Sequence, residues 1–351
     1  MLRLPAGLVM LPPDWDSAER AEIAMAGTYI LAVDIGGTKI ATAVISFTGE
    51  ILQMSKAPTA LDSPPALLKQ ITAMLHDDLA RAGVDIADVL GLGIGIPAVI
   101  DAEHKIVVWA PNLPGWKQIP LHAELTARFN LPVCIEYDGH AAALGEWWRG
   151  AGRGYQSMVF VIVGTGIGGG MILDGRLYRG VSGLAGAAGW FVLGAGRVSD
   201  RYALQVGHWE SLAAGPGVAR LTAERLRQSG KPSLLRQWCP DPYDKLTAQM
   251  VFDAARQGDA LAQEIVNQTG EILGVGIANL VSVLNPEVVV LGGGVGVQAD
   301  LLMDRIREVV LHNAQPVSAK AVRIVPSQLG ETAGLLGVTK AVLLYCQGRD
   351  E

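Results

Sequence analysis

Two glycine-rich turns have the residue types that bind phosphate. The first reads Asp34-Ile35-Gly36-Gly37-Thr38-Lys39, the second is the run Gly164–Gly170, and each lies between two apolar, strand-like segments. Glycines let backbone N–H groups point at a phosphate, and a threonine hydroxyl adds another donor. A carboxylate at the end of a strand, such as Asp34, suits Mg²⁺ held through its water shell. For both segments the alternative is an ordinary glycine turn, with a solvated aspartate at the first.

The second turn also satisfies the pattern G-x-G-x-x-G of dinucleotide-binding folds. In those folds a helix opens at the glycines, and an acidic residue follows about 20 residues later. Here a strand follows instead, and Asp174-Gly175 predicts a tight turn behind it. We therefore reject a dinucleotide-binding fold. Two interpretations of the second turn remain: a phosphate-binding loop and a glycine turn with a purely structural role.

Asp138 is the candidate general base. It lies where a predicted strand, 131–136, meets a predicted helix, 138–148. A carboxylate at the positive end of a helix is expected to stay ionised near neutral pH. Such a group can accept the proton of an attacking hydroxyl. A plain helix-capping aspartate is the alternative.

The elements around the two glycine turns repeat one pattern. Each turn lies within a strand-turn-strand-turn-strand sequence, which predicts two duplicated domains. The strands expected around the turns are 29–33, 40–47 and 50–54 in the first copy, and 158–163, 171–173 and 176–179 in the second. The other expected elements are strands at 89–96, 131–136 and 288–291 and helices at 64–83, 121–129, 138–148, 247–258, 260–284, 300–312 and 334–345. Thr247 and Asp259 are the expected N-caps of the helices at 247–258 and 260–284.

Composition excludes several classes of protein. The chain has 351 residues, 50% of them hydrophobic and 18% charged, so it can bury a core. Its net charge of −6 argues against a general nucleic-acid binder, and no apolar run of about 18 residues predicts a membrane span. Cys134, Cys239 and Cys346 are isolated, which fits the reducing cytoplasm. Residues 1–28 form an N-terminal extension in which Met25 is a possible start.

Taken together, the motifs resemble the ROK family of sugar kinases and related repressors, in the actin-like ATPase superfamily. The matching segments are LAVDIGGTKIATAVI (31–45), GLGIGIPAVID (91–101), APNLPGW (110–116), DGHAAALGE (138–146), GTGIGGGMILDGRLYRG (164–180), GEILGVGIANLVSVLNPEVVVLGGGV (270–295) and GETAGLLGV (330–338). The resemblance implies an α/β fold: two actin-like ATPase (ribonuclease H-like) lobes, duplicated domains around a central cleft. The first lobe would be 29–137 plus 331–351 and the second 138–330. With no DNA-binding domain expected before residue 29, the kinase branch fits better than the repressor branch.

The resemblance also assigns site residues. Asp138 would be the catalytic base, and Asp34 would bind Mg²⁺ through water. The residues implied for ATP are Asp34, Gly36, Gly37, Thr38 and Lys39 in the first turn, Gly164, Thr165 and Gly166 in the second, and Gly292, Gly293 and Gly294 against the nucleoside. Those implied for the sugar are Asn112, Trp116, Tyr137, Asp138, Ala187, Trp190 and Glu210. Trp116 could stack on a sugar ring, and a core position is its alternative.

The sugar half of the implied site departs from the family pattern. Tyr137 and His140 stand where the family usually has asparagines, and the segment 180–190 departs from G-x-x-G-x-A-G-E-x-G-H at its end. Ala187 replaces the glutamate that grips sugar hydroxyls, and Trp190 replaces the histidine. Losing a buried hydrogen-bond partner costs ~1–3 kcal/mol. We therefore expect an acceptor less polar or bulkier than glucose, such as a substituted, deoxy or acylated sugar.

The family's zinc ligands are also missing. No cysteine lies between Arg197 and Gly207, and the family's G-C-L-E reads Gly207-His208-Trp209-Glu210, so that Glu210 alone remains of the second carboxylate site. Four ligands cannot be assembled from His208 alone. The sequence therefore predicts no zinc.

The interpretation is Mg²⁺- and ATP-dependent phosphorylation of a sugar hydroxyl by a cytoplasmic enzyme. A homodimer is expected, with the helix pair 247–284 as its surface, and neither nucleic acid nor a membrane is expected as a partner. The alternative is a non-catalytic sugar- or nucleotide-binding sensor, a pseudokinase on the same scaffold. The altered sugar segment motivates this alternative, and the intact Asp34, Gly36, Gly37, Thr38 and Asp138 argue against it.

Overall fold

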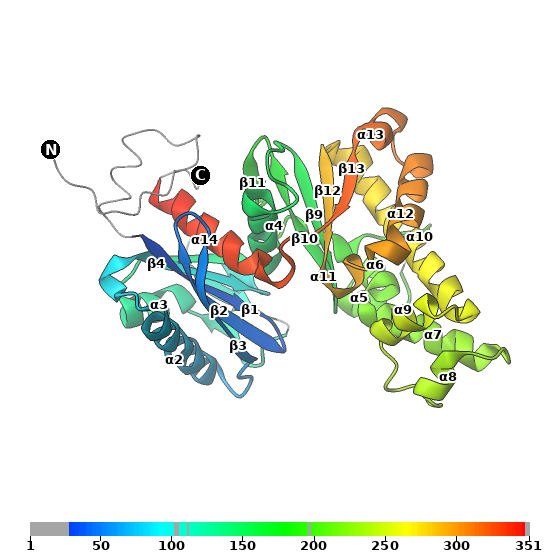
Figure 1. The fold of residues 1–351 in the computed structure, drawn as a ribbon, viewed down its shortest axis with the longest axis horizontal. Coiled ribbons are helices and arrows are strands. Elements are labelled where there is room, and N and C mark those ends of the chain that lie inside the picture. The colour runs from blue at the N-terminus through cyan, green and yellow to red at the C-terminus, as the bar shows by residue number, and fades with distance from the viewer. Residues whose placement is uncertain (1–27, 102–104, 111, 196–197, 348–351) are drawn as a thin grey trace. The chain divides into compact units, whose positions relative to one another are not determined.

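The computed structural model describes residues 28–347 except 102–104, 111 and 196–197 (Figure 1). The chain divides into two compact units: unit 1 contains the residues up to Ala141 and those from Gly334 onward, and unit 2 is Ala142–Ala333. One break falls inside helix α4 (Asp138–Arg149), and the other at the start of helix α14 (Ala333–Cys346). Except for Thr28, the expected N-terminal extension lies outside the described residues.

Unit 1 is built on a five-stranded sheet with the order β3-β2-β1-β4-β8. The first three strands form an antiparallel meander, and β4 and β8 run parallel to β1. The carboxyl ends of β1, β4 and β8 therefore meet at one edge. The strands are β1 Tyr29–Ile35, β2 Lys39–Ser46, β3 Ile51–Pro58, β4 Val89–Ile96 and β8 Val133–Tyr137.

The alternation of side chains along β4 explains how helices cover both faces of this sheet. Its sequence VLGLGIGI directs the large residues to one face and three glycines to the other. Of the large residues, Leu92, Ile94 and Ile96 belong to the core beneath α2 (Pro64–Ala82) and α3 (Leu121–Phe129). On the other face a Cβ on Gly93 would lie 2.6 Å from the carbonyl oxygen of Val338 in α14. Because the three glycines of β4 have no side chains, α14 packs directly on the strand, on the face opposite α2 (Figure 1).

A second, three-stranded sheet in unit 1 was not predicted. Its order is β5-β6-β7, and both pairs are antiparallel. The strands are β5 Val99–Asp101, β6 Ile106–Trp109 and β7 Lys117–Ile119. A short 3₁₀ turn, η1 Ile86–Asp88, precedes β4.

Unit 2 repeats the sheet of unit 1, which confirms the predicted duplication. Its order is β11-β10-β9-β12-β13, with an antiparallel meander β9–β11 and with β12 and β13 parallel to β9. The Asp174-Gly175 turn was predicted correctly, with φ of 50° and 72° at its two residues. The strands are β9 Met158–Val163, β10 Ile167–Leu173, β11 Arg176–Tyr178, β12 Val288–Gly292 and β13 Arg323–Pro326.

Helices supply most of the core of unit 2. As predicted, the Thr247 hydroxyl caps α9, accepting the Met250 N–H at 3.3 Å, and Asp259 caps α10, accepting the Ala262 N–H at 2.9 Å. The apolar faces of α10 are largely buried in this core. The helices are α5 Ala203–Val206, α6 His208–Ala213, α7 Gly215–Gln228, α8 Leu234–Trp238, α9 Ala248–Arg256, α10 Ala260–Leu284, α11 Gly293–Gly296, α12 Ala299–Asn313 and α13 Pro316–Ala321, with 3₁₀ turns η2 Ala188–Trp190 and η3 Gly330–Thr332.

Among the described residues, no helix is both long enough and apolar enough to span a bilayer.

Candidate functional site

The first glycine turn closes the β1–β2 hairpin in unit 1. Gly36 donates its N–H to the carbonyl of Lys39 at 2.9 Å, and the side chains of Thr38 and Lys39 are exposed. Thr59 braces the turn, because its hydroxyl donates to the Gly36 carbonyl at 2.7 Å and its N–H donates to the Thr38 carbonyl at 3.1 Å. The turn is thus held from behind while its hydroxyl and ammonium groups face solvent, as a phosphate-binding turn requires.

Asn112 lies against this turn. A Cβ on Gly37 would come within 3.1 Å of the Asn112 Cβ, so the glycine is what allows the two segments to approach. Asn112 is exposed, although its neighbours Leu113 and Trp116 are buried. The structure therefore brings one predicted sugar ligand beside the first predicted phosphate turn.

Asp34 is the last residue but one of β1, at the edge where the parallel strands end. It pairs with Gly95 of β4, and a Cβ on Gly334 in α14 would overlap its carboxyl. Two glycines thus make the space that the carboxyl occupies. Within the described part of the chain the Asp34 side chain makes no hydrogen bond or ion pair. Burial and the negative charge of Asp138 raise the pKa of Asp34 to about 7. A solvated aspartate, the alternative considered above, does not fit this environment.

Asp138 is the first residue of α4, directly after β8, as the sequence predicts. Its carboxyl accepts the Gly139 N–H at 2.8 Å. Burial nevertheless outweighs this hydrogen bond and raises the pKa of Asp138 to about 6. A carboxyl with that pKa is mostly ionised at pH 7, which agrees with the expectation from the sequence, although burial shifts its pKa toward neutrality. A pKa just below the working pH suits a general base.

The residues around Asp138 have different environments. Tyr137 ends β8, and its ring meets the ring of His140 edge to face at 5.3 Å. His140 is 1% exposed, with Nδ1 3.9 Å from a carboxylate oxygen of Glu136. Trp116 is 3% exposed and packs in the core of unit 1. The core alternative therefore fits Trp116, and its ring has no free face for stacking on a sugar.

The second glycine turn, Gly164-Thr165-Gly166, closes the β9–β10 hairpin in unit 2. Gly164 donates to the carbonyl of Gly166 at 2.9 Å, and its own carbonyl accepts the N–H of Gly215, the first residue of α7, at 2.8 Å. A Cβ on Gly164 would lie 3.9 Å from the N of Gly294. The second turn and the Gly292–Gly294 turn are therefore neighbours within unit 2. The last of these is a strand-to-helix turn, since α11 begins at Gly293.

A cavity of about 480 Å³ adjoins the second turn and was not predicted. It lies between the N-terminal part of α7 and the segment before α9, and Gly215 connects it to the turn. Its volume is within the ~300–1,000 Å³ range of small-molecule sites. The lining residues are Gly215, Pro216, Ala219, Arg220, Ala223, Tyr243, Asp244, Leu246 and Thr247.

Glu210 stabilises the second turn through a side-chain hydrogen bond to the backbone. Its carboxylate accepts the N–H of Ile167, the residue after the turn, at 2.7 Å. Burial raises the pKa of Glu210, and this hydrogen bond partly opposes the shift. A Cβ on Gly189 would lie 3.1 Å from the same carboxylate. The sequence did not reveal this role, because Ile167 and Glu210 are 43 residues apart.

The predicted sugar segment lies beside that carboxylate in unit 2. A Cβ on Gly186 would lie 2.5 Å from the Gly169 carbonyl, so the segment runs against β10. Ala187 is half-buried, and Trp190 is 58% exposed. The side chain at the position of the family histidine is thus an accessible apolar ring.

Phe191 and Leu193, which follow this segment, are held against α6 by ring packing and hydrogen bonds, among them the backbone N–H of Trp209 to the Phe191 carbonyl at 3.0 Å. His208 Nδ1 accepts the Leu193 N–H at 3.0 Å, and the rings of Phe191 and Trp209 stack with centroids 5.8 Å apart. In the part of the chain that the structure describes, no group of three or more His, Cys, Asp or Glu side chains could hold a metal ion.

Comparisons with known proteins extend over nearly the whole chain. The ROK family profile matches residues 30–344. A glucokinase of Halalkalibacterium halodurans is 33% identical over 314 residues, covering 89% of this chain and 94% of that protein. A xylose repressor of Caldicellulosiruptor bescii is 29% identical over 323 residues, covering 90% and 78% respectively. The crystal structure of a ROK family glucokinase from Streptomyces griseus in complex with glucose and AMPPNP superimposes with a TM-score of 0.75 at 31% identity, covering 89% of this chain and 98% of that one.

Proposed function

This chain belongs to the ROK family, and from that premise we propose that Asp138 is the general base with which it transfers the γ-phosphoryl group of ATP to a sugar hydroxyl. Family membership and the glucokinase relatives make the chain an ATP-dependent carbohydrate kinase. The observation that carries the role of Asp138 is its position in unit 1, at the sheet edge next to Asp34.

The residues of unit 1 have distinct tasks in this proposal. Asp138 accepts the proton of the attacking hydroxyl as the oxygen approaches the γ-phosphorus, and its pKa of about 6 leaves it ionised and basic at pH 7. The exposed Thr38 hydroxyl and Lys39 ammonium, with the backbone N–H groups of the turn, bind phosphate oxygens. Asn112, against Gly37, orients the sugar.

The residues of unit 2 hold the rest of the nucleotide. Gly164, Thr165 and Gly166 bind phosphate through their backbone and hydroxyl groups. The neighbouring turn Gly292, Gly293 and Gly294 lies against the nucleoside. We assign the nucleoside to the cavity beside Gly215 on the strength of its volume and its link to the second turn.

Asp34 is the residue that fits Mg²⁺. Its carboxyl is partly buried and has no hydrogen-bond partner among the described residues, and burial together with the nearby Asp138 carboxylate raises its pKa. Such a group favours a cation nearby, directly or through water. When bound, Mg²⁺ supplies neutralisation of the charge on the phosphate oxygens. The positive charge of bound Mg²⁺ would also lower the pKa of both Asp34 and Asp138.

The acceptor is a sugar with a less polar or bulkier substituent than glucose carries. Ala187 offers no hydrogen-bond acceptor from its side chain, and the exposed Trp190 ring offers an apolar surface. Acyl, deoxy or alkyl groups bury well against such a surface, whereas free hydroxyls would lose hydrogen bonds there.

An assay of ADP release from ATP against a panel of sugars tests the activity and the acceptor. We expect turnover, with substituted, deoxy or acylated sugars preferred. A strong preference for unsubstituted glucose would refute the acceptor class. ATP binding with no turnover on any sugar would indicate the sensor, the function that the altered positions Ala187 and Trp190 favour.

Three further properties belong to the proposal. His208 already accepts a backbone hydrogen bond, which supports the absence of zinc. The three free cysteines support a cytoplasmic location. A homodimer rests on the family alone, because the apolar faces of α10 are largely covered within unit 2. Light scattering on the purified chain tests the dimer: a particle of twice the mass of one chain is expected.

A further inference from the structure

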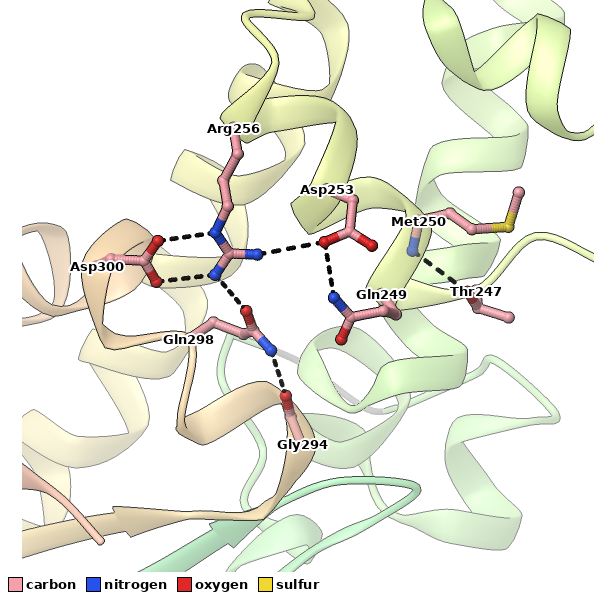
Figure 2. A network of polar contacts seen from close by, with 8 residues as sticks. All are labelled: Thr247, Gln249, Met250, Asp253, Arg256, Gly294, Gln298 and Asp300. Atoms are coloured by element: carbon pink, nitrogen blue, oxygen red, sulfur yellow. Dashed lines mark hydrogen bonds and ion pairs between the residues drawn. The ribbon is translucent and has the colours of Figure 1, made fainter. Parts of the chain in front are cut away.

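Arg256, the last residue of α9, makes the densest set of polar contacts near the Gly292–Gly294 turn (Figure 2). Its Nε and Nη2 atoms each lie 2.8 Å from an oxygen of Asp300, which makes a bidentate pair. Its Nη1 lies 3.4 Å from Asp253, and its Nη2 donates to the Oε1 of Gln298 at 2.5 Å. The guanidinium thus joins α9 to the start of α12.

Gln298 links Arg256 to the Gly292–Gly294 turn by hydrogen bonds at both ends of its side-chain amide. Its Nε2 donates to the carbonyl oxygen of Gly294 at 2.9 Å (Figure 2). A guanidinium can only donate and a carbonyl can only accept, so the two partners fix which way the amide points. Gln298 is 9% exposed. A buried amide satisfied at both ends holds one orientation.

The Gln298 side chain gives the Gly294 carbonyl a hydrogen-bond donor that the backbone of the turn does not provide. Helix α11 ends after one turn, and the backbone N–H of Gln298 donates to Val295 at 3.1 Å, not to Gly294. The side-chain amide of Gln298 satisfies the Gly294 carbonyl instead. On the other side of the turn Gly293 has φ of 79°, and a Cβ there would overlap the Val163 carbonyl. The turn is therefore held from the β9 side and from the Gln298 side.

Gly294 itself faces open space. A Cβ there would meet nothing within 4 Å, and the second phosphate turn is its neighbour through Gly164. The same helix that ends in Arg256 begins after Thr247, which lines the cavity assigned to the nucleoside. One rigid element thus connects the cavity to the network behind the turn.

We propose that Arg256 and Gln298 are positioning residues that fix the Gly292–Gly294 turn for the nucleotide, and so set the affinity for ATP and leave that for the sugar unchanged. This inference rests on the proposed function, because it needs the nucleotide at the turn. Neither residue is catalytic. Arg256 and Asp300 are both substantially exposed, with side-chain exposures of 36% and 56%, so their pair contributes little to stability.

The test compares three variants with a matched control. Arg256→Ala removes the guanidinium, and Arg256→Lys keeps its charge but not the bidentate geometry. Gln298→Glu keeps an acceptor for Arg256 and loses the donor to the Gly294 carbonyl. Arg305→Ala is the control, because Arg305 also bridges two carboxylates, Glu271 at 3.1 Å and Glu308 at 2.8 Å, without contacting the turn.

We expect Arg256→Ala and Gln298→Glu to raise the KM for ATP and the Kd of AMPPNP about tenfold, the effect of losing one charge-assisted or buried hydrogen bond. The KM for the sugar should stay within about twofold, and Arg256→Lys should restore part of the ATP affinity. Arg256→Ala should keep close to the wild-type Tm, because its ion pair with Asp300 is exposed. The inference is overturned if Gln298→Glu leaves the KM for ATP unchanged, or if Arg305→Ala raises it equally. A wild-type chain that binds no nucleotide would overturn the proposed function as well, so the two failures are distinguishable.

Discussion

Replacing Asp34 by asparagine should stabilise the protein while removing its metal ligand. Burial and Asp138 hold the pKa of Asp34 at about 7, against an ordinary value of 3.8. Between these values the native state binds more protons than the unfolded state, so stability falls as pH rises from about 4 to 7. With ~1.4 kcal/mol per pKa unit, the raised pKa of Asp34 lowers the free energy of unfolding by about 4 kcal/mol at pH 8, where native Asp34 is ionised in a buried site. At pH 5 native Asp34 is protonated whereas the unfolded chain is ionised, and the loss is roughly 2 kcal/mol. Asparagine does not titrate, so the variant does not lose this part of the free energy of unfolding.

Urea titrations of the wild type and Asp34→Asn at both pH values measure this difference. The variant should be more stable by about 4 kcal/mol at pH 8, and its advantage should be about halved at pH 5. Asp62→Asn is the control, because Asp62 is an exposed aspartate of the same unit, and its free energy of unfolding should hardly change. An Asp34→Asn variant less stable than the wild type at pH 8, or an advantage independent of pH, would refute the reasoning.

Three more outcomes follow from the site. Because protonation of Asp138 removes the base, kcat/KM should fall about tenfold per pH unit below its pKa of about 6, and a flat profile down to pH 5 would contradict the role. Gly294→Ala should keep the wild-type Tm, since its Cβ meets nothing within 4 Å, and should raise the KM for ATP; an unchanged KM would place the nucleotide elsewhere. Incubation with dipicolinic acid, a zinc chelator, followed by dialysis into Mg²⁺ should leave Tm and activity unchanged, whereas a lower Tm would reveal structural zinc.

The sequence predicted the features that depend on local residue types. Both glycine hairpins, the Asp174-Gly175 turn and the caps Thr247 and Asp259 need particular residues at particular places, so they can be identified from a single sequence. The repetition of one strand pattern around two such turns then predicted two similar sheets, which the structure contains.

What the sequence did not predict depends on contacts between distant residues. The small sheet β5–β7 has strands of three and four residues, too short for a period of two to be recognised. The raised pKa values of Asp34 and Asp138 come from burial, which a strand-to-helix motif does not reveal. The Gly294 turn was expected, but Gln298 and Arg256 behind it had no sequence signal, because Arg256 reaches Gln298 across 42 residues.

Asp138→Asn tests the central claim most directly, by kcat at saturating ATP and sugar together with the Kd of AMPPNP from calorimetry. The account predicts a kcat lower by about 10²–10⁴-fold, the contribution expected of a general base, and a Kd within about twofold of the wild type. A variant that keeps more than about a tenth of the wild-type kcat would contradict it, since general-base catalysis contributes more than that.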